Sequence, residues 1–268
     1  MQAKLTQWSL RQHLDGAALR ACSRFELFDT LASTNTYLKQ FSPESPGVCQ
    51  VVLAEAQTGG RGRRGNAWFS PPQASLYMSL RTRLAHDESM LGLLPLGIGA
   101  VVAESLQTLG LTGHGLKWPN DLLKVGRKFG GILVESDRVR SRDMAVTIGI
   151  GLNVDFHGIT PGEVTQPWTD LASIMTGGVP DRAELAGQIL NGLLALLTAL
   201  ADSRDAAILP RWRHYDLTCG QTVAITAGDG TYHSGRAMGI DRRGRLIVDT
   251  DQGSRLFDGG EVSLRLPL

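Results

Sequence analysis

The pattern of hydrophobic and polar positions predicts two regions of different architecture. Up to residue 218, apolar residues at helical spacing alternate with short apolar runs typical of buried strands. Helices are expected at Leu5–Arg20, where Gly16 weakens the pattern, and at Leu91–Leu109, Asp170–Met175 and Arg182–Leu200. Strands are expected at Phe25–Phe28, Val48–Glu55, Ser75–Leu84, Gly115–Trp118, Gly131–Glu135 and Ala145–Val154. This region therefore mixes helices with strands.

From Cys219 onward the chain shows short strands and tight turns without a helical pattern. The expected strands are Thr222–Thr226, Tyr232–Ile240, Leu246–Asp251 and Val262–Leu266. Such spacing is typical of a small closed barrel. We place the boundary near Asp216–Gly220, which predicts one domain over residues 1–218 and a second over 219–268. Before it, His157–Asp170 has two prolines, two glycines and little periodicity, and is expected to be a mobile loop.

Composition and charge exclude some classes of protein. The apolar share of 42% and the charged share of 20% are those of an ordinary globular protein. The 27 basic and 26 acidic side chains nearly cancel. A basic surface spread over the whole molecule, as many nucleic-acid-binding proteins have, is therefore not expected, although a local basic loop remains open.

The cysteines and the apolar stretches predict a cytoplasmic protein. Cys22, Cys49 and Cys219 are far apart and show no CxxC or zinc spacing, so we expect three buried or inert thiols in a reducing compartment. The amino terminus lacks the continuous apolar core of a signal peptide. The longest apolar stretch, Ile189–Ala201, is short and carries Asn191, which predicts a buried helix and no membrane span.

The most informative segment is the Gly-Arg loop, Gln57–Gly65, with the sequence QTGGRGRRG. Its four glycines allow close approach to a ligand, and its three arginines offer planar, permanently charged donors. Such a loop after a buried strand suits a phosphate or carboxylate. It is neither a Walker A loop nor a dinucleotide fingerprint. On composition alone, a flexible basic surface loop or an RNA-contacting loop is an equally good interpretation.

Further clusters of polar and aromatic residues follow the strands. They are Ser33–Asn35 before a helical run, Trp68-Phe69 after the Gly-Arg loop, Lys117–Asp121 at a strand end, Lys128 at a strand start, and Asn153 behind Gly149 and Gly151. Each has an ordinary structural explanation, as an N-cap, a core aromatic, a turn or a solvated lysine. Only their combination and order point to a site.

In combination these segments resemble the biotin–protein ligase family over about Phe25–Arg265. The matching blocks are Ser33–Asn35, the Gly-Arg loop, Trp68–Pro71, Lys117–Asp121, Lys128 with Gly130–Glu135, Gly149–Val154 and Gly259–Arg265. The resemblance implies an α/β (α+β) catalytic domain akin to class II aminoacyl-tRNA synthetases, with a mixed, mostly antiparallel sheet. It also implies a carboxyl-terminal SH3-like barrel, which agrees with the strand-rich end.

The resemblance implies a role for each matching residue. Arg63 and Lys128 are the expected catalytic residues. The biotin pocket is expected to be formed by Ser33, Thr34, Asn35, Gln57, Arg61, Gly62, Arg63 and Lys128. The ATP and adenylate side is expected to be formed by Arg61, Arg63, Arg64, Trp68, Asn120 and Asn153. Asp121 is a candidate magnesium ligand, with a turn-forming role an equal alternative. The family pattern has arginine where this chain has Asn66, which removes one cation from the loop.

The resemblance also implies the reaction and its partners. The substrates are ATP and biotin, with Mg²⁺, and the acceptor is a lysine of a biotin carboxyl carrier protein. Some members carry an amino-terminal helix-turn-helix and repress transcription. The 24 residues before Phe25 are too few for such a domain, which needs roughly sixty, so we expect a ligase that binds no DNA. Relatives occur as monomers and dimers, and both states stay open. A lipoate or octanoate transferase is the nearest alternative, and a non-enzymatic RNA-binding module is the alternative from another class.

Overall fold

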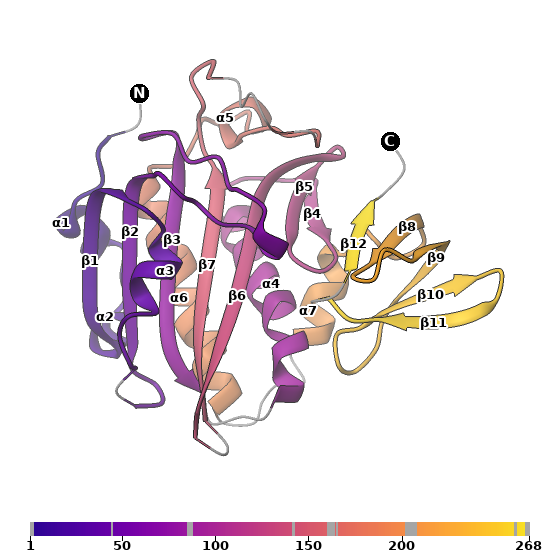
Figure 1. Ribbon diagram of the computed structural model, residues 1–268. Helices are drawn as coiled ribbons and strands as arrows, with labels where there is room; N and C mark the ends of the chain where they lie inside the picture. Colours follow the sequence, from indigo (N-terminus) through magenta and orange to yellow (C-terminus); the bar gives the residue numbers. More distant parts are fainter. Residues whose placement is uncertain are drawn as a thin grey trace.

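A computed structural model describes residues 3–43, 45–84, 88–140, 143–159, 164, 166–201, 208–259 and 262–265. Within these residues the larger part of the molecule is a seven-stranded sheet covered by helices. A separate five-stranded antiparallel sheet forms the carboxyl-terminal part (Figure 1). The expected mixed fold with a strand-rich end is therefore confirmed.

The large sheet is mixed, with the order β1-β2-β3-β7-β6-β5-β4. Its strands are β1 (Cys22–Leu31), β2 (Cys49–Gln57), β3 (Ser75–Leu84), β4 (His114–Lys117), β5 (Asp121–Lys124), β6 (Arg127–Arg140) and β7 (Asp143–Asn153). β1 and β2 run parallel, and every other neighbouring pair is antiparallel. All six strands expected in this region overlap observed strands. β5 was missed because four residues after a proline turn carry too little periodicity.

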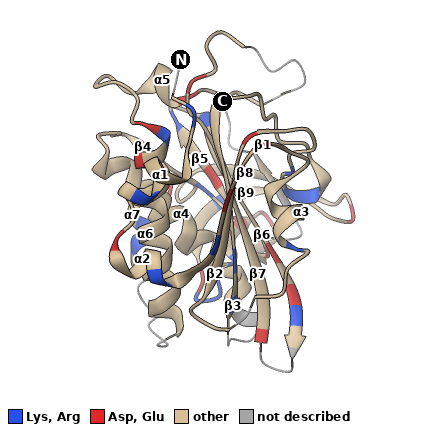
Figure 2. Cartoon of the chain, turned by 90° about the vertical axis from the view of Figure 1, so that its left-hand side faces the viewer, with Lys and Arg blue, Asp and Glu red and all other residues tan. Residues whose placement is uncertain are grey.

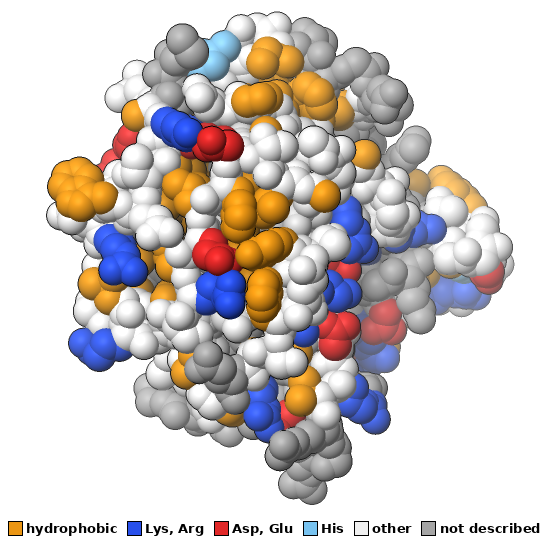
Figure 3. Space-filling model, turned by 60° about the vertical axis from the view of Figure 1, so that its left-hand side comes forward, with side chains coloured by type: hydrophobic (Ala, Val, Ile, Leu, Met, Phe, Trp, Pro, Cys, Tyr) orange, Lys and Arg blue, Asp and Glu red, His pale blue; other side chains and the backbone are white. Residues whose placement is uncertain are grey.

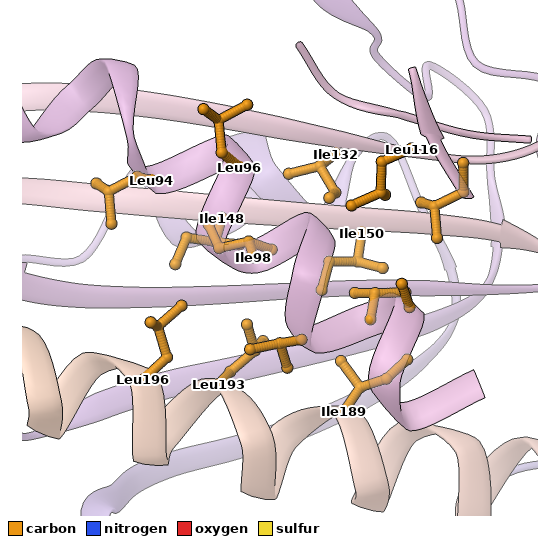
Figure 4. Packing of buried hydrophobic residues seen from close by; sticks show 14 of the residues in the cluster. Leu94, Leu96, Ile98, Leu116, Ile132, Ile148, Ile150, Ile189, Leu193 and Leu196 are labelled. Atoms are coloured by element: carbon orange, nitrogen blue, oxygen red, sulfur yellow. The ribbon is translucent and has the colours of Figure 1, made fainter. Parts of the chain in front are cut away.

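Helices cover both faces of the large sheet (Figure 2). α4 (Leu94–Thr108) and α6 (Arg182–Ala201) form a layer on one face, and α3 (Thr34–Leu38) lies on the other. Between sheet and helix layer, one buried hydrophobic cluster includes Ile150 of β7, Ile98 of α4 and Leu193 of α6 (Figure 4). Each such side chain contributes about 1.5–3 kcal/mol when fully buried. The remaining elements of this part are η1 (Arg63–Gly65), η2 (Glu88–Gly92), α5 (Leu171–Ile174) and α7 (Ile208–Tyr215).

Two core segments have the length and hydropathy of a membrane span, which the apolar pattern did not lead us to expect. The segments Met90–Thr108 and Arg182–Ala201 are long and apolar enough to span a membrane, so the expectation that no segment reaches that length is wrong. In the structure 72% and 61% of their apolar windows are buried inside the protein. A helix packed on several sides is apolar around its circumference, which explains the composition.

The amino-terminal helix is divided in two. Instead of one helix over Leu5–Arg20, the structure has α1 (Gln7–Gln12) and α2 (Gly16–Ala21), both packed against α6. Asp15 separates them because its side chain caps the amino terminus of α2. Its own N–H donates to Asn191 Oδ1 of α6 at 3.1 Å. Tertiary contact and capping thus outweigh the helical spacing.

Hydrophobic side chains also gather on the face formed by β1 and α3 (Figure 3). The ring centroids of Phe28 and Tyr37 lie 4.9 Å apart, and those of Tyr37 and Phe41 lie 5.2 Å apart. The Arg24 guanidinium covers the Phe41 ring at 4.1 Å from its centroid. Because such aromatic contacts add about 0.5–1.5 kcal/mol each, this stack holds α3 and its polar amino terminus against β1.

The small sheet has the order β11-β10-β9-β8-β12. Its strands are β8 (Thr222–Ala227), β9 (Tyr232–Ile240), β10 (Leu246–Thr250), β11 (Gly253–Phe257) and β12 (Val262–Arg265). The four expected strands are present. β11 was missed because four of its five side chains are exposed, which leaves no alternation to detect. α7 was missed as well, since Pro210 interrupts its apolar pattern.

One tryptophan joins the two sheets. Trp118 follows β4 and is fully buried, and its Nε1 donates to the Gly244 carbonyl at 2.9 Å. Its main-chain N–H donates to Thr218 Oγ1 at 2.9 Å. The Trp118–Pro119 peptide bond is cis. The strand end that carries Asn120 and Asp121 is therefore held against the carboxyl-terminal sheet.

The cysteines are not three isolated buried thiols. Cys22 and Cys49 are register partners at the starts of β1 and β2, with their Sγ atoms 3.2 Å apart. Cys49 is buried and Cys22 half-buried, whereas Cys219 is exposed. Cys22 and Cys49 are therefore not isolated, because parallel pairing brings together residues that are 27 positions apart in sequence, while the inertness of the thiols stays a prediction.

The expected mobile loop His157–Asp170 is described only in part, because residues 160–163 and 165 lie outside the described residues. Its final part is bonded to β6. The N–H of Lys128 donates to the Pro167 carbonyl and the N–H of Thr169 donates to the Lys128 carbonyl, both at 2.9 Å. These bonds fix the main chain of Lys128, while the mobility of the loop stays a prediction.

Candidate functional site

The Gly-Arg loop leaves β2 and folds back on itself. The N–H of Trp68 donates to the Gly60 carbonyl at 2.9 Å, and the N–H of Gly62 donates to the Asn66 carbonyl at 2.7 Å. A Cβ on Gly60 would lie 2.5 Å from Ser70 Oγ, so this position requires glycine. The Gly62 N–H, expected to hold an anion, is thus used within the loop in this structure.

A buried polar cluster lies beside the start of this loop. Thr34 donates from its N–H to Gln57 Oε1 at 2.9 Å, and Gln57 Nε2 donates to Ser70 Oγ at 3.2 Å. Ser79 Oγ lies 2.7 Å from Thr34 Oγ1 and 2.6 Å from Asn35 Oδ1. Ser33 caps the amino terminus of α3 with its side chain. Three expected biotin-pocket residues, Thr34, Asn35 and Gln57, therefore meet in one cluster that offers both donors and acceptors, and Ser33 precedes Thr34 at the start of α3.

Glu135 joins this cluster to the Gly-Arg loop, although it was not among the expected site residues. Its Oε2 accepts from Asn35 Nδ2 at 3.0 Å, and its Oε1 lies 3.2 Å from Arg61 Nη2 and 3.5 Å from Lys39 Nζ. Because a carboxylate only accepts, it turns the amide of Asn35 so that Oδ1 points to Ser79. Its place in the Gly130–Glu135 block was the available signal.

Two glycines of β7 place the polar cluster next to an aromatic side chain. A Cβ on Gly149 would lie 2.4 Å from Asn35 Oδ1, and a Cβ on Gly151 would lie 2.6 Å from Trp68 Cε2. Residues two apart on a strand share a face and lie about 7 Å apart. Asn35 and the Trp68 indole therefore lie side by side on this face, and Asn153 follows on it, donating to the Thr169 carbonyl at 2.9 Å.

Trp68 forms a platform over the paired strands β6 and β7. Gly131 and Gly151 are register partners beneath its ring. Lys128 Nζ lies 5.2 Å from the ring centroid. Within the described part of the chain, the buried Trp68 Nε1 has no hydrogen-bond partner. Such a buried donor can be satisfied by a ligand atom.

The Gly151→Ala variant is expected to displace Trp68, because a β-carbon at 2.6 Å from the ring cannot be accommodated in place. If Trp68 supports a ligand ring, the KM for that ligand should rise about tenfold, the equivalent of 1.4 kcal/mol. Titration followed by tryptophan fluorescence and steady-state kinetics measures this. Gly177→Ala, where nothing lies within 4 Å of the added carbon, is the matched control. Unchanged affinity in Gly151→Ala would contradict the platform role.

Cationic side chains surround the outer part of this platform. Arg63 Nη1 donates to Asn120 Oδ1 at 3.0 Å, and Asn120 Nδ2 donates to the Ile132 carbonyl at 2.7 Å. Burial lowers the pKa of Arg63, and Asp121 opposes that shift. Arginine titrates so far above neutral pH that the guanidinium stays charged. Arg64, in contrast, is exposed, and its φ is 56°. Arg61 and Arg63 are the loop arginines that contact site residues, Glu135 and Asn120 respectively.

Asp121 is paired with lysines from two strands. Its Oδ1 lies 2.6 Å from Lys128 Nζ and its Oδ2 lies 3.0 Å from Lys117 Nζ. Burial by itself raises the pKa of Asp121, but the two ammonium groups outweigh burial and hold the pKa below its ordinary value. Asp121 is therefore ionised at neutral pH.

The donor set around Asp121 does not fit a resident metal ion. No group of three or more His, Cys, Asp or Glu side chains that could hold a metal occurs in the residues that the structure describes. Both oxygens of Asp121 contact lysine ammonium groups instead. Magnesium normally enters nucleotide sites with several waters and through few protein carboxylates. The magnesium role of Asp121 stays a prediction, and no step below depends on it.

The site places a buried polar cluster beside the Trp68 indole, with arginine and lysine side chains near both. A model of the biotin/lipoate A/B protein ligase family matches residues 27–153, and a model of the biotin protein ligase C terminal domain matches residues 218–265. The chain belongs to the biotin/lipoate protein ligase family, in its biotin protein ligase branch. The expected family is confirmed.

Curated relatives and a solved structure give the extent of this similarity. The chain is 37% identical to the bifunctional ligase/repressor BirA of Escherichia coli over 235 residues, covering 87% of this chain and 71% of that protein. It is 32% identical to the biotin--[acetyl-CoA-carboxylase] ligase of Mycobacterium tuberculosis over 270 residues, covering 98% and 96%. The biotin protein ligase from Aquifex aeolicus in complex with biotin and ATP superposes with a TM-score of 0.76 at 27% identity, covering 91% of this chain and all of that one.

Proposed function

We propose that this chain is an ATP-dependent biotin–protein ligase. It converts biotin and ATP to biotinyl-5'-AMP and pyrophosphate, and then transfers biotin to a lysine of a biotin carboxyl carrier protein. The observation that carries the proposal is the position of Asn35 and Trp68 over two glycines that lie two positions apart on one strand, with Lys128 beside the indole ring. Relatives named as biotin ligases align with nearly the whole chain, which supports the same assignment.

In this proposal the polar cluster binds the ureido ring of biotin. Ser33, Thr34, Asn35 and Gln57 supply hydroxyl, amide and main-chain groups. A buried ureido group left without partners would cost about 1–3 kcal/mol per group. The hydrogen bonds in the structure support the assignment, because Ser79, Ser70 and Glu135 already orient these side chains.

Arginine and lysine side chains are proposed to stabilise the chemical step. A carboxylate oxygen of biotin attacks the α-phosphorus of ATP, a phosphorus–oxygen bond forms, and pyrophosphate leaves. Two anions meet in this step, so Arg61, Arg63 and Lys128 are proposed to neutralise charge at both. Trp68 supports the adenine ring, with Arg64, Asn120 and Asn153 on the nucleotide side. In the second step the acceptor lysine amine attacks the acyl carbon and AMP leaves.

Pyrophosphate release tests the proposal directly. The protein is incubated with ATP, Mg²⁺ and either biotin, lipoate or octanoate, followed by transfer to a biotin carboxyl carrier domain. We expect release with biotin and labelling of the carrier lysine. Turnover with lipoate or octanoate alone would favour the acyl transferase alternative. No turnover together with salt-sensitive RNA binding would favour the nucleic-acid-binding module.

Arg63→Ala is expected to release the adenylate prematurely. Arg63 Nη1 is held by Asn120, and its cation is proposed to contact the phosphate of the intermediate. Losing a charge-assisted hydrogen bond of this kind costs about 1.5–3 kcal/mol, a tenfold or larger increase in leakage. Trapping of free biotinyl-5'-AMP with hydroxylamine measures it, with Arg213→Ala, at an exposed arginine of α7, as the comparison. Equal leakage in the unchanged chain and Arg63→Ala would remove Arg63 from the site.

Several further assignments belong to the same proposal. We assign the catalytic part to residues 1–218, with a fold akin to class II aminoacyl-tRNA synthetases, and residues 219–268 to an SH3-like barrel. The mixed, mostly antiparallel sheet and the five-stranded sheet support this. We also propose a cytoplasmic location, a monomer or homodimer, use of Mg²⁺ with ATP, and no operator binding. A gel-shift experiment with biotin-operon DNA tests the last point.

A further inference from the structure

Asp121 is a buried carboxylate shared by two lysines that come from different strands. Lys117 ends β4 and is the cross-strand partner of Asp121, which begins β5. Lys128 lies near the start of β6 and reaches the other carboxylate oxygen. The side chain of Asp121 is only 11% exposed, and those of Lys117 and Lys128 are 16% and 17% exposed. Two cations thus face one anion in a largely water-excluded place.

The two lysines have different surroundings. Lys128 Nζ lies 5.2 Å from the centroid of the Trp68 ring, on the side of the proposed nucleotide pocket. Lys117 Nζ donates to the Leu264 carbonyl of β12 at 3.4 Å, on the side of the carboxyl-terminal sheet. Lys128 is therefore placed to reach a ligand above Trp68, whereas Lys117 is held by its hydrogen bond to the carboxyl-terminal sheet.

Moving Lys128 toward a ligand has an electrostatic consequence for Asp121. If Lys128 were the only partner, its departure would leave a buried carboxylate without a counterion, which is strongly unfavourable. With Lys117 at Oδ2, Asp121 keeps one ion pair throughout. The second lysine thus lowers the free-energy cost of releasing the first.

We propose that Lys117 is a positioning residue that keeps Asp121 paired while Lys128 leaves it for the biotin carboxylate and the phosphate of the adenylate. This proposal rests on the proposed function. Lys117 acts through Asp121 and does not touch the reacting atoms. Its contact with Leu264 makes the carboxyl-terminal sheet part of the arrangement, since that carbonyl helps to hold the ammonium group in place.

The test is a set of single-turnover measurements of adenylate formation at saturating biotin and ATP. Lys117→Met is expected to slow this step about 10- to 100-fold, the usual effect of removing a supporting residue behind a catalytic group. Biotin affinity, measured by equilibrium titration, is expected to fall less than the rate, because the polar cluster and Arg61 still bind biotin. Lys117→Arg keeps the cation and should recover most of the rate. Lys124→Met is the matched control, because Lys124 lies on the same hairpin and bonds the Ile174 carbonyl instead.

A double variant separates electrostatic positioning from a loss of folding. In Lys117→Met, Asp121 has Lys128 as its remaining lysine partner and holds it too firmly. Adding Asp121→Asn removes that attraction and should raise the rate of adenylate formation again. A merely structural Lys117 predicts a double variant at least as slow as the single one. That result, or a slow Lys117→Arg, or an equal loss in Lys124→Met, would overturn the proposal while leaving the proposed function intact. Absence of biotin-dependent pyrophosphate release by the unchanged chain would overturn both.

Discussion

Replacing Lys128 with alanine is expected to slow formation of biotinyl-5'-AMP about 10²- to 10³-fold, the usual effect of removing one preorganised electrostatic group. The main chain of Lys128 is fixed by bonds to Pro167 and Thr169, and its ammonium group lies between Asp121 and the Trp68 ring. Because its main chain is fixed, only the ammonium group has to move from Asp121 when the two anions meet. Alanine also leaves Arg63 and Arg61 in place, so substrate binding should weaken less than the rate.

Rapid-quench measurement of pyrophosphate release at saturating substrates gives the rate of this step, and biotin titration gives the affinity separately. Lys4→Ala is a suitable control, because Lys4 pairs with Asp29 at the surface, away from the site. Transfer from chemically prepared biotinyl-5'-AMP should be affected less than adenylate formation. Near-normal adenylate formation in Lys128→Ala would remove Lys128 from the catalytic set.

Arg182→Met is expected to lower the free energy of unfolding by about 3–5 kcal/mol, because it leaves the buried carboxylate of Glu55 without its charged partner. Arg182 is fully buried at the start of α6, and its Nη1 lies 2.7 Å from Glu55 Oε2. The same guanidinium donates to the carbonyls of Ser75 and Ala3, at 3.2 and 2.8 Å. Glu55 Oε1 also accepts from the N–H of Leu5 at 2.7 Å, so the pair fastens the amino-terminal segment to the sheet.

Urea unfolding monitored by circular dichroism measures the change in free energy. The double variant Glu55→Leu with Arg182→Met should recover a large part of the loss, because two apolar side chains of similar volume replace both charges. Asp29→Ala, which breaks the exposed pair with Lys4, should leave stability nearly unchanged. A single Arg182→Met variant as stable as the unchanged chain would show that this ion pair contributes little.

Much of the fold could be predicted from local patterns. The strands β3 and β7 bury nearly every side chain, so their apolar runs were visible, and the helix α6 shows its apolar face over twenty residues. Elements without such a signal were missed, among them β5 with four residues and the exposed β11. The break between α1 and α2 also escaped, because Asn191, far away in sequence, bonds the main chain there.

In the candidate site, too, some residues could be predicted from the sequence and others could not. Ordered blocks of sequence led to Asn35, Trp68 and Lys128, because glycines, aromatics and cations in a family order are visible without a structure. Their partners Glu135, Ser79 and Lys117 were given no role. Each is an ordinary strand residue whose importance comes from which strand lies beside it.

The sequence by itself determined the family and the two-part organisation, and it led to the proposed site residues, since these follow from residue types and their order along the chain. Only the tertiary structure decided how they work together. Strand register placed Gly149 and Gly151 under Asn35 and Trp68, and the pairing of β4, β5 and β6 gave Asp121 two lysines instead of one. Register depends on contacts between distant segments, and a shift by one residue would have turned each of these side chains to the opposite face.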